Sequence, residues 1–519
     1  MSCAVQDDEA VRCVSFEVRC PLRAADAVLE HISAGLEREL GVRAAHRRPA
    51  GRELELAGGL RVRLLAQPAW PVRSRPAETV TVTVIVQNPA AAQPGADRPC
   101  LDRQATRVLE LAQRVPLTEL EWRELTEQMP LTATLPEHLP AGCLAGIAPV
   151  MTVHHMRDFL IMVDAVRQLG AEPETMTVLD KGYRYRHTHR VDAHLRELGV
   201  RVWPWQRADE ALKDHVARAR GAGRRGMLVD DGGYTLPVLM EQCPDLLDDF
   251  VGLVEQTASG IARLAPYGEA LPLPVFSVAE SAMKAAIEPY GIADAALRNL
   301  AALLPEEKWE GQAALVLGFG RIGARLAEVL RQRRMRVAVH DVATEALITA
   351  LEQGFETGPD LCALLRRHQP MLVMGTTGVT SLRAEHIPAL GRDCYLVSLT
   401  SRDREFDLPA LRTAAVDERD AGQLGTRLRM PHGPQVTVVA DGYPINFHWA
   451  ESLPNKYADL VLASLIVGAA TLARPGHGFV PGHNVRRTNQ VLADSGLLER
   501  YYARFGPHHA TGDGIGRYR

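Results

Sequence analysis

The feature that most constrains the fold of this chain is an apolar run followed by three spaced glycines, residues 315–324 (LVLGFGRIGA). The apolar residues are typical of a buried strand, and the helical pattern after them predicts a strand–turn–helix unit. Gly318 permits a tight turn, and Gly320 lets the backbone approach a pyrophosphate. Gly323 lets the helix pack closely on the strand, and the helix N-terminus presents its N–H groups to the phosphates.

A carboxylate at the right distance supports dinucleotide binding. The next apolar run, residues 337–340 (VAVH), ends at Asp341, at about the 20-residue offset where an acid accepts both ribose hydroxyls of NAD. Such an acid would repel the extra phosphate of NADP. A lone G-x-G-x-x-G is often only a tight loop, but here the strand, the helix and the acid all fall where they are needed. We therefore predict NAD as the cofactor, with contacts from Gly318, Gly320, Arg321, Ile322, Gly323 and Asp341.

The length, charge and cysteine pattern exclude several classes of protein. A chain of 519 residues is expected to form several domains. The net charge of −4 gives no reason to expect nucleic acid or a membrane as partner. The eight cysteines form no C-x-x-C pair, so neither a metal site nor a disulfide framework is predicted. No secretion signal is visible and the apolar stretch 460–472 is too short to span a bilayer, so a cytoplasmic protein is expected.

The pattern of expected strands and helices divides the chain into four regions. Residues 1–100 have the pattern of a small α+β module, and residues 101–270 that of the first part of a substrate-binding domain. Residues 271–445 continue a βαβ alternation typical of a Rossmann domain, and residues 446–519 are helical. The last region is expected to complete the substrate domain and to make oligomer contacts. The predicted fold class is α/β: a Rossmann NAD-binding domain, a split α/β substrate domain and an extra N-terminal α+β domain.

Several separated motifs, found in one order, resemble S-adenosylhomocysteine hydrolase over roughly residues 115–519. These are residues 228–235 (LVDDGGYT), 254–260 (VEQTASG), 277–284 (SVAESAMK), 317–323 (LGFGRIG), 374–378 (MGTTG), 440–446 (ADGYPIN) and the RYR terminus. The N-terminal module lies outside the resemblance.

The resemblance implies a bound NAD that acts catalytically. In that family the 3′-hydroxyl of an adenosine is oxidised, the C4′ proton becomes acidic, the 5′ substituent is eliminated, water adds, and the ketone is reduced again. Lys284 matches the lysine beside the 3′-hydroxyl, and Glu288, which replaces an aspartate, would orient it. Asp231 matches the carboxylate near C4′, and His154 matches the first catalytic histidine. The implied NAD contacts are Thr257, Ser259, Thr376, Thr377, Gly378 and Asn446.

The chain departs from the family pattern at three further positions. Gln256 replaces a glutamate that holds ribose hydroxyls, and Ser401 stands where the family has a histidine. A second family histidine aligns with Leu453, and the register is supported by Pro454. His448 and Glu451 lie close to that position and are candidates for substitute acid–base chemistry, or are surface and dimer-contact groups.

A basic and aromatic run, residues 181–190 (KGYRYRHTHR), has two interpretations. It is either a solvated loop or part of the pocket for the 5′ substituent. In the second case Arg184 and Arg186 would favour an acidic group, because guanidinium forks match carboxylates and phosphates. With these arginines, the predicted substrate contacts are Glu255, Gln256 and Ser401. The apolar helix expected at 457–472 is core or subunit interface, and a homodimer or homotetramer is predicted.

Each catalytic candidate also has a structural interpretation. Lys284 could be a solvated helix lysine, Asp231 could belong to a plain turn, and only one of His154 and His155 can face a site. The preferred hypothesis is an NAD-containing enzyme that oxidises the ribose 3′-hydroxyl of an adenosine-type nucleoside and makes or breaks a bond at C5′, in specialised metabolism. The alternatives are a genuine S-adenosylhomocysteine hydrolase with a remodelled site, a non-catalytic NAD-binding regulator, and a simple NAD-dependent dehydrogenase.

Overall fold

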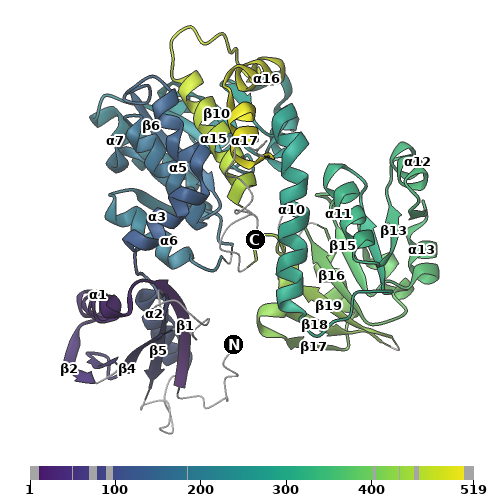
Figure 1. The fold of residues 1–519 in the computed structure, drawn as a ribbon, viewed down its shortest axis with the longest axis horizontal. Helices are drawn as coiled ribbons and strands as arrows, with labels where there is room; N and C mark the ends of the chain where they lie inside the picture. Colours follow the sequence, from purple (N-terminus) through teal and green to yellow (C-terminus); the bar gives the residue numbers. More distant parts are fainter. Residues whose placement is uncertain are drawn as a thin grey trace. The chain divides into compact units, whose positions relative to one another are not determined.

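A computed structural model describes residues 11–48, 51–68, 79–88, 98–183, 185–400, 405–431, 433–448 and 455–507. The chain forms two compact units, whose helices and strands are labelled in Figure 1. Unit 1 combines residues 1–128 with 187–202, and unit 2 combines residues 129–186 with 203–519. The chain therefore leaves unit 1, enters unit 2, returns to unit 1 for one short segment, and finishes in unit 2.

Unit 1 is built on a five-stranded antiparallel sheet in the order β1-β5-β4-β3-β2. Its strands are β1 (Val11–Arg19), β2 (Val42–Arg48), β3 (Gly51–Leu56), β4 (Arg61–Pro68) and β5 (Thr79–Gln87). In β5, Val80, Val82, Val84 and Val86 are buried while the residues between them are half-buried, as expected for a sheet covered on one face. Helices α1 (Ala25–Leu40) and α2 (Arg98–Ala112) supply the rest of this core.

Two further helices belong to unit 1, α3 (Glu119–Gln128) and α6 (Thr188–Glu197). They are joined by a buried ion pair between Arg190 and Glu121, whose side chains are 2% and 1% exposed. The Arg190 guanidinium also donates to the carbonyl oxygens of Val115 and Pro116. This cluster ties the returning segment to the rest of the unit.

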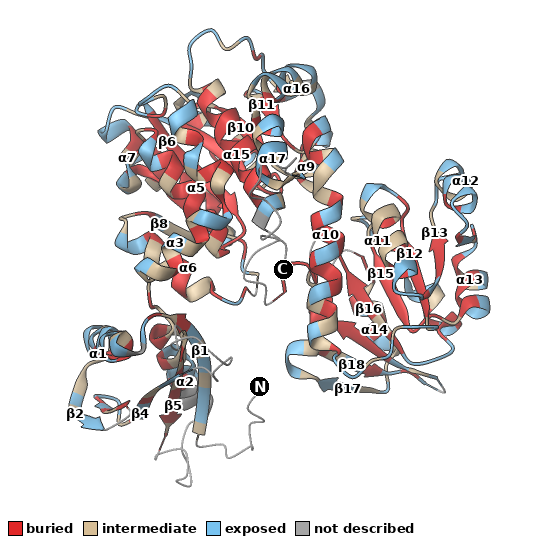
Figure 2. Ribbon diagram, in the orientation of Figure 1, coloured by how far each residue is buried: buried red, intermediate tan, exposed pale blue. Residues whose placement is uncertain are grey.

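Unit 2 contains two sheets, and the first includes the strand order β20-β11-β10-β9-β6-β7. Its strands are β6 (Ile147–Val153), β7 (Thr177–Asp180), β9 (Arg225–Asp230), β10 (Phe250–Glu255), β11 (Pro274–Ser277) and β20 (Gly482–His483). The division of the chain between the two units falls within β8 (Arg201–Pro204). The pairs from β20 to β7 are parallel, and β6 is buried along its whole length (Figure 2). Helices α5 (Arg157–Gln168) and α15 (Asn455–Leu472) pack against each other, and α15 also contacts β10.

The second sheet has the order β14-β13-β12-β15-β16-β19-β18-β17. The parallel strands are β12 (Ala313–Leu317), β13 (Arg336–His340), β14 (Glu356–Thr357), β15 (Leu372–Gly375), β16 (Cys394–Ser398) and β19 (Gln435–Val439). The strands β17 (Asp417–Asp420) and β18 (Gly425–Arg429) extend it antiparallel. The predicted Rossmann arrangement and the α/β fold class are confirmed.

The strand order of the second sheet reverses at β12, which has β13 on one side and β15 on the other. In open α/β sheets, ligands bind beyond the carboxyl ends of the strands at such a point. The glycine-rich turn and α11 (Arg321–Gln332) follow β12, and residues 376–378 follow β15. The long helix α10 (Ala282–Leu303) precedes β12. Within the described ranges, no helix is long and apolar enough to cross a membrane, and no cluster of three potential metal ligands occurs.

Candidate active site

A cavity of about 390 Å³ in unit 2 is bordered by residues from both parallel sheets. It collects most of the residues singled out from the sequence. The predicted residues that line it are His154, Asp231, Gln256, Thr257, Ser259, Lys284, Glu288, Ile322, Thr376, Thr377, Gly378 and Asn446. Most of the catalytic candidates and part of the cofactor candidates thus share one cavity.

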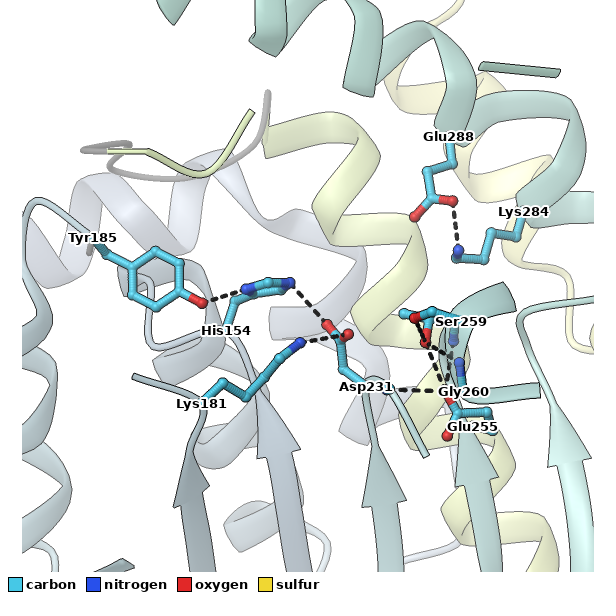
Figure 3. Close-up of polar contacts among 11 residues, drawn as sticks. His154, Lys181, Tyr185, Asp231, Glu255, Ser259, Gly260, Lys284 and Glu288 are labelled. Carbon is cyan, nitrogen blue, oxygen red and sulfur yellow. Dashed lines mark hydrogen bonds and ion pairs between the residues drawn. The ribbon is translucent and has the colours of Figure 1, made fainter. Parts of the chain in front are cut away.

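Asp231 stands at the centre of a hydrogen-bonded group on one side of the cavity (Figure 3). It follows β9 directly, and its backbone N–H donates to the carbonyl of Thr152 in β6, at 2.7 Å. Its Oδ1 accepts from the Lys181 ammonium at 2.8 Å, and its Oδ2 lies 3.1 Å from Nε2 of His154. Three segments far apart in the chain therefore meet at one carboxylate.

His154 is held by contacts at both of its ring nitrogens. Its Nδ1 is hydrogen-bonded to the Tyr185 hydroxyl, and its ring stacks on Phe447 with centroids 3.8 Å apart. A neutral imidazole has one N–H, and the atom facing a carboxylate is the one that can usefully carry it. We therefore assign the proton to Nε2, which donates toward Asp231, while Nδ1 accepts from Tyr185.

The charges of Asp231, Lys181 and His154 follow from their burial and from the short distances between them. Burial opposes ionisation of Asp231, but the Lys181 ammonium and His154 outweigh it and hold the pKa of Asp231 well below its usual range. Burial also disfavours a charged Lys181, yet the Asp231 carboxylate raises the pKa of Lys181. Burial, followed by the Lys181 charge, lowers the pKa of His154. At neutral pH the group is an ion pair beside a neutral imidazole.

Lys284 lies on another wall of the cavity, in the first turn of α10. The Ser281 hydroxyl caps this helix by accepting from the Lys284 backbone N–H. The Lys284 ammonium donates to Glu288, one turn later, at 2.5 Å. Lys284 is 7% exposed, so its head group is held by one carboxylate at the cavity wall and is not the solvated lysine of the structural interpretation.

Glu255 is placed differently from the other candidates. It is fully buried at the end of β10 and does not line the cavity. Its carboxyl oxygens accept from the backbone N–H groups of Gly232, Gly233 and Thr257. A Cβ at Gly260 would overlap it. Burial, and then the neighbouring Asp230, raise the pKa of Glu255 well above its usual range. Glu255 braces the two turns that carry Asp231 and Thr257.

The glycine-rich turn fits a dinucleotide. Gly318 has φ +92°, and a Cβ there would press on Thr376 and Thr377. A Cβ at Gly323 would overlap the Gly318 carbonyl oxygen, whereas a Cβ at Gly320 would meet nothing within 4 Å. The close helix–strand packing and the open space at the helix N-terminus are the features that a bound pyrophosphate needs.

Two further observations indicate a ligand of this kind. Asp341 accepts from the Phe319 backbone N–H at 2.6 Å, which places it against the glycine-rich turn. The side-chain oxygens of Gln256 and Asn446 are buried, line the cavity and have no hydrogen-bond partner among the described residues. Buried acceptors of this kind normally receive a donor, so they suit a polar ligand.

Several sequence candidates lie elsewhere. His448 is buried outside the cavity and hydrogen-bonds through Nε2 to the Gln423 carbonyl, and Arg186 is exposed. Arg321, in the first turn of α11, does not line the cavity. The candidates Arg184, Ser401 and Glu451, and the departure at Leu453, fall outside the described residues.

The individual roles of Lys181, Tyr185 and Asp158 were not predicted from the sequence. Lys181 was considered only as part of a basic run, although it directly follows β7 at the edge where β6 and β9 also end. A lysine at the carboxyl end of a parallel strand is a signal that could have singled it out. Tyr185 and Asp158 are buried beside the site, and the sequence carries no comparable signal for them.

Comparison with known proteins agrees with the predicted NAD-binding fold. Residues 303–452 match the family model described as "S-adenosyl-L-homocysteine hydrolase, NAD binding domain". The S-inosyl-L-homocysteine hydrolase of Methanopyrus kandleri is 27% identical over 371 residues, 70% of this chain and 85% of that protein. An adenosylhomocysteinase of Halobacterium salinarum is 26% identical over 60% of this chain and 72% of its own. An uncharacterized protein of Mycobacterium tuberculosis is 30% identical over 63% of this chain, which spans 64% of that protein.

The fold and site define an α/β protein with a Rossmann domain for NAD and a second parallel sheet that completes the cavity. The family match at residues 303–452 and these relatives support a divergent member of the S-adenosylhomocysteine hydrolase superfamily. Its cofactor is NAD.

Proposed function

We propose that this protein is an enzyme that oxidises the ribose 3′-hydroxyl of an adenosine-type nucleoside and uses the resulting acidity to make or break a bond at C5′. One observation carries the proposal: the Lys284–Glu288 pair and the Asp231 group line the same cavity as the residues matched to NAD contacts. The relatives named as S-inosyl-L-homocysteine hydrolase and adenosylhomocysteinase support a purine nucleoside as the substrate class.

The residues divide into a group for the 3′ position and a group for C4′. NAD, when bound, supplies the acceptor for the hydride that leaves the 3′ carbon. Lys284 passes a proton of its ammonium to Glu288 and, as a neutral amine, takes the proton of the 3′-hydroxyl; Glu288 also holds the lysine in the orientation that this transfer requires. Asp231, whose Oδ2 lies 3.1 Å from Nε2 of His154, accepts the C4′ proton once the ketone has made it acidic.

The cavity wall also favours this chemistry because much of it is apolar. Met156, Phe159, Leu399 and Phe447 border the cavity together with the charged groups. Apolar walls limit the access of water while the sugar carries a ketone, and they strengthen the electrostatic interactions inside.

The test is reduction of the bound cofactor by a nucleoside. The purified NAD-loaded protein is mixed with adenosine or with inosine, and absorbance in the NADH band is followed. We expect reduction by at least one nucleoside, and a fall in its rate of about 100-fold or more in Lys284→Met, as for loss of a general base. Lys308→Met, at an exposed lysine before β12, is the matched control and should behave as the wild type. No reduction by either nucleoside would contradict the proposal and favour a non-catalytic NAD-binding protein.

A second measurement separates altered chemistry from ordinary hydrolysis. The protein is incubated with S-adenosylhomocysteine, and the products are separated. Because histidines expected from the family resemblance are replaced at Ser401 and Leu453, we expect little release of adenosine and homocysteine. Rapid release would instead identify a genuine S-adenosylhomocysteine hydrolase with a remodelled site.

A further inference from the structure

We propose that Lys181 is the proton donor and acceptor at the 5′ position of the substrate. Its ammonium gives a proton to the heteroatom that leaves C5′ and recovers one from the group that adds there. This inference rests on the proposed function, since it assigns a residue to the second half of that reaction.

Lys181 is a buried cation at the cavity wall. It is 5% exposed and donates one hydrogen bond, to Asp231. The rings of Tyr183 and Tyr234 lie near the ammonium, at 5.2 and 5.9 Å from their centroids. A lysine ammonium has three N–H donors, and Asp231 is its one hydrogen-bond acceptor within the described part of the chain. Lys181 therefore keeps donors for a ligand in the cavity that it lines.

The neighbours of Lys181 are less suited to donate a proton. Asp231 is ionised, so it can accept a proton but has none to donate. Each of its oxygens has one contact and therefore still has a free lone pair. His154 is engaged at Nδ1 by Tyr185 and faces Asp231 with Nε2. Asp231 is thus suited to accept the C4′ proton. Of Asp231, His154 and Lys181, it is Lys181 that can donate a proton to the substrate.

The order of the groups across the site matches the order of the sugar carbons. In Figure 3, Asp231 lies between Lys181 on one side and Lys284 on the other. In ribose, C4′ is bonded to C3′ and to C5′. A sugar with its 3′-hydroxyl toward Lys284 and C4′ toward Asp231 directs its C5′ toward Lys181.

The proposed step balances without another reagent. When Asp231 removes the C4′ proton, the electron pair forms the C4′–C5′ double bond and the bond from C5′ to the heteroatom breaks. The heteroatom leaves with the bonding pair and takes a proton from Lys181. In the reverse direction, water adds its oxygen to C5′, one proton returns to Lys181, and C4′ is protonated again.

Adenosine tests this assignment because its own 5′-hydroxyl is then the leaving group. The NAD-loaded protein is incubated with adenosine, or with inosine, in deuterium oxide and separately in water labelled with heavy oxygen. Mass spectrometry and NMR follow deuterium at C4′ and heavy oxygen at C5′. For Lys181→Met we expect NADH formation to persist, while incorporation of heavy oxygen falls about 100-fold or more. Lys213→Met, at an exposed lysine of α7 (Ala208–Gly221), should match the wild type.

A second variant guards against a merely structural effect. In Lys181→Ala, added methylamine should restore incorporation of heavy oxygen, whereas tetramethylammonium, which carries a charge but no proton, should not. The inference is overturned if Lys181→Met incorporates heavy oxygen at the wild-type rate, if it loses NADH formation to the same extent, or if methylamine gives no rescue. Failure of the wild type to form NADH with either nucleoside contradicts the proposed function itself, and this inference with it.

Discussion

At the scale of single residues, two carboxyl groups of the same cavity have opposite acid–base properties. Asp231 is paired with Lys181 and stays ionised. Asp158, in the first turn of α5, is 3% exposed and accepts a hydrogen bond from its neighbour Phe159. Burial raises the pKa of Asp158 to about 7. Its local environment, more than its residue type, therefore decides the charge that a carboxyl group brings to this cavity.

The raised pKa of Asp158 has a consequence for stability. An unfolded aspartate loses its proton near pH 4, whereas folded Asp158 keeps it to about pH 7. Between these values the unfolded state binds fewer protons, so this residue makes the folded protein less stable as pH rises, with no further change above the folded pKa. We expect the free energy of unfolding of Asp158→Asn, relative to the wild type, to rise by about 1–4 kcal/mol between pH 4.5 and pH 8.

Denaturant unfolding at the two pH values measures this difference. The asparagine oxygen can still accept from the Phe159 backbone, so the local hydrogen bond is kept. Asp164→Asn, on the same helix and paired with Arg167, is the control and should show a much smaller change. A relative stability of Asp158→Asn that does not depend on pH would show that Asp158 is already ionised in the folded protein at low pH.

At the scale of elements, helix α6 depends on one buried ion pair. Arg190 is surrounded by acceptors from the segment that precedes α3 and pairs with Glu121 at 2.6 Å. The backbone N–H groups of Arg19 and Thr118 also donate to Glu121. Burial opposes ionisation of Glu121, but Arg190 outweighs it and lowers the pKa of Glu121. Helix α6 is therefore held by an ion pair in which both partners also make hydrogen bonds to backbone groups.

Removing one partner of this pair should be costly. In Arg190→Met the Glu121 carboxylate stays buried without its counter-charge, and we expect a loss of about 3–5 kcal/mol in the free energy of unfolding. Arg196→Met removes an exposed ion pair with Asp192 on the same helix and should cost less than about 1 kcal/mol. Denaturant unfolding followed by circular dichroism compares the two variants. Equal effects would mean that the buried pair stabilises unit 1 no more than an exposed ion pair does.

At the scale of the whole molecule, two separate segments of the chain form unit 1. The core of the antiparallel sheet includes Val108 and Ala112 of α2, and the returning segment supplies Arg190. Unit 1 therefore takes residues from beyond position 100, where the composition of the sequence suggests a boundary. A piece of chain cut at that position would keep most of α2 but lose the sheet that buries it.

This arrangement predicts how truncated chains behave. A protein that begins at residue 101 should expose the apolar face of α2, bind a hydrophobic dye and aggregate. One that begins at residue 114 lacks α2 but keeps the Val115 and Pro116 carbonyls that hold Arg190, and it should be more soluble. Light scattering and dye fluorescence compare the two at equal concentration. Equal solubility would show that α2 does not need this sheet.

Local sequence patterns determined several strands and helices of this protein and one ion pair of the site. The apolar run and glycines at 313–323 specify strand, turn and helix through backbone requirements that lie within a few residues of each other. The alternation in β5 specifies a half-buried strand for the same reason. Lys284 and Glu288 are one helical turn apart, so their pairing follows from the helix alone.

Tertiary structure decided the contacts between distant segments. Asp231 and Lys181 are 50 positions apart and meet because β7 and β9 both flank β6 and end at the same edge. Glu255 and Gln256 are neighbours in the chain, yet the Glu255 side chain points into the adjacent loops and the Gln256 side chain lines the cavity. The two differ because successive side chains at a strand end point to opposite sides. The physical reason is the same in both cases: the order of strands in the sheet, which no local pattern encodes, sets which side chains share a space.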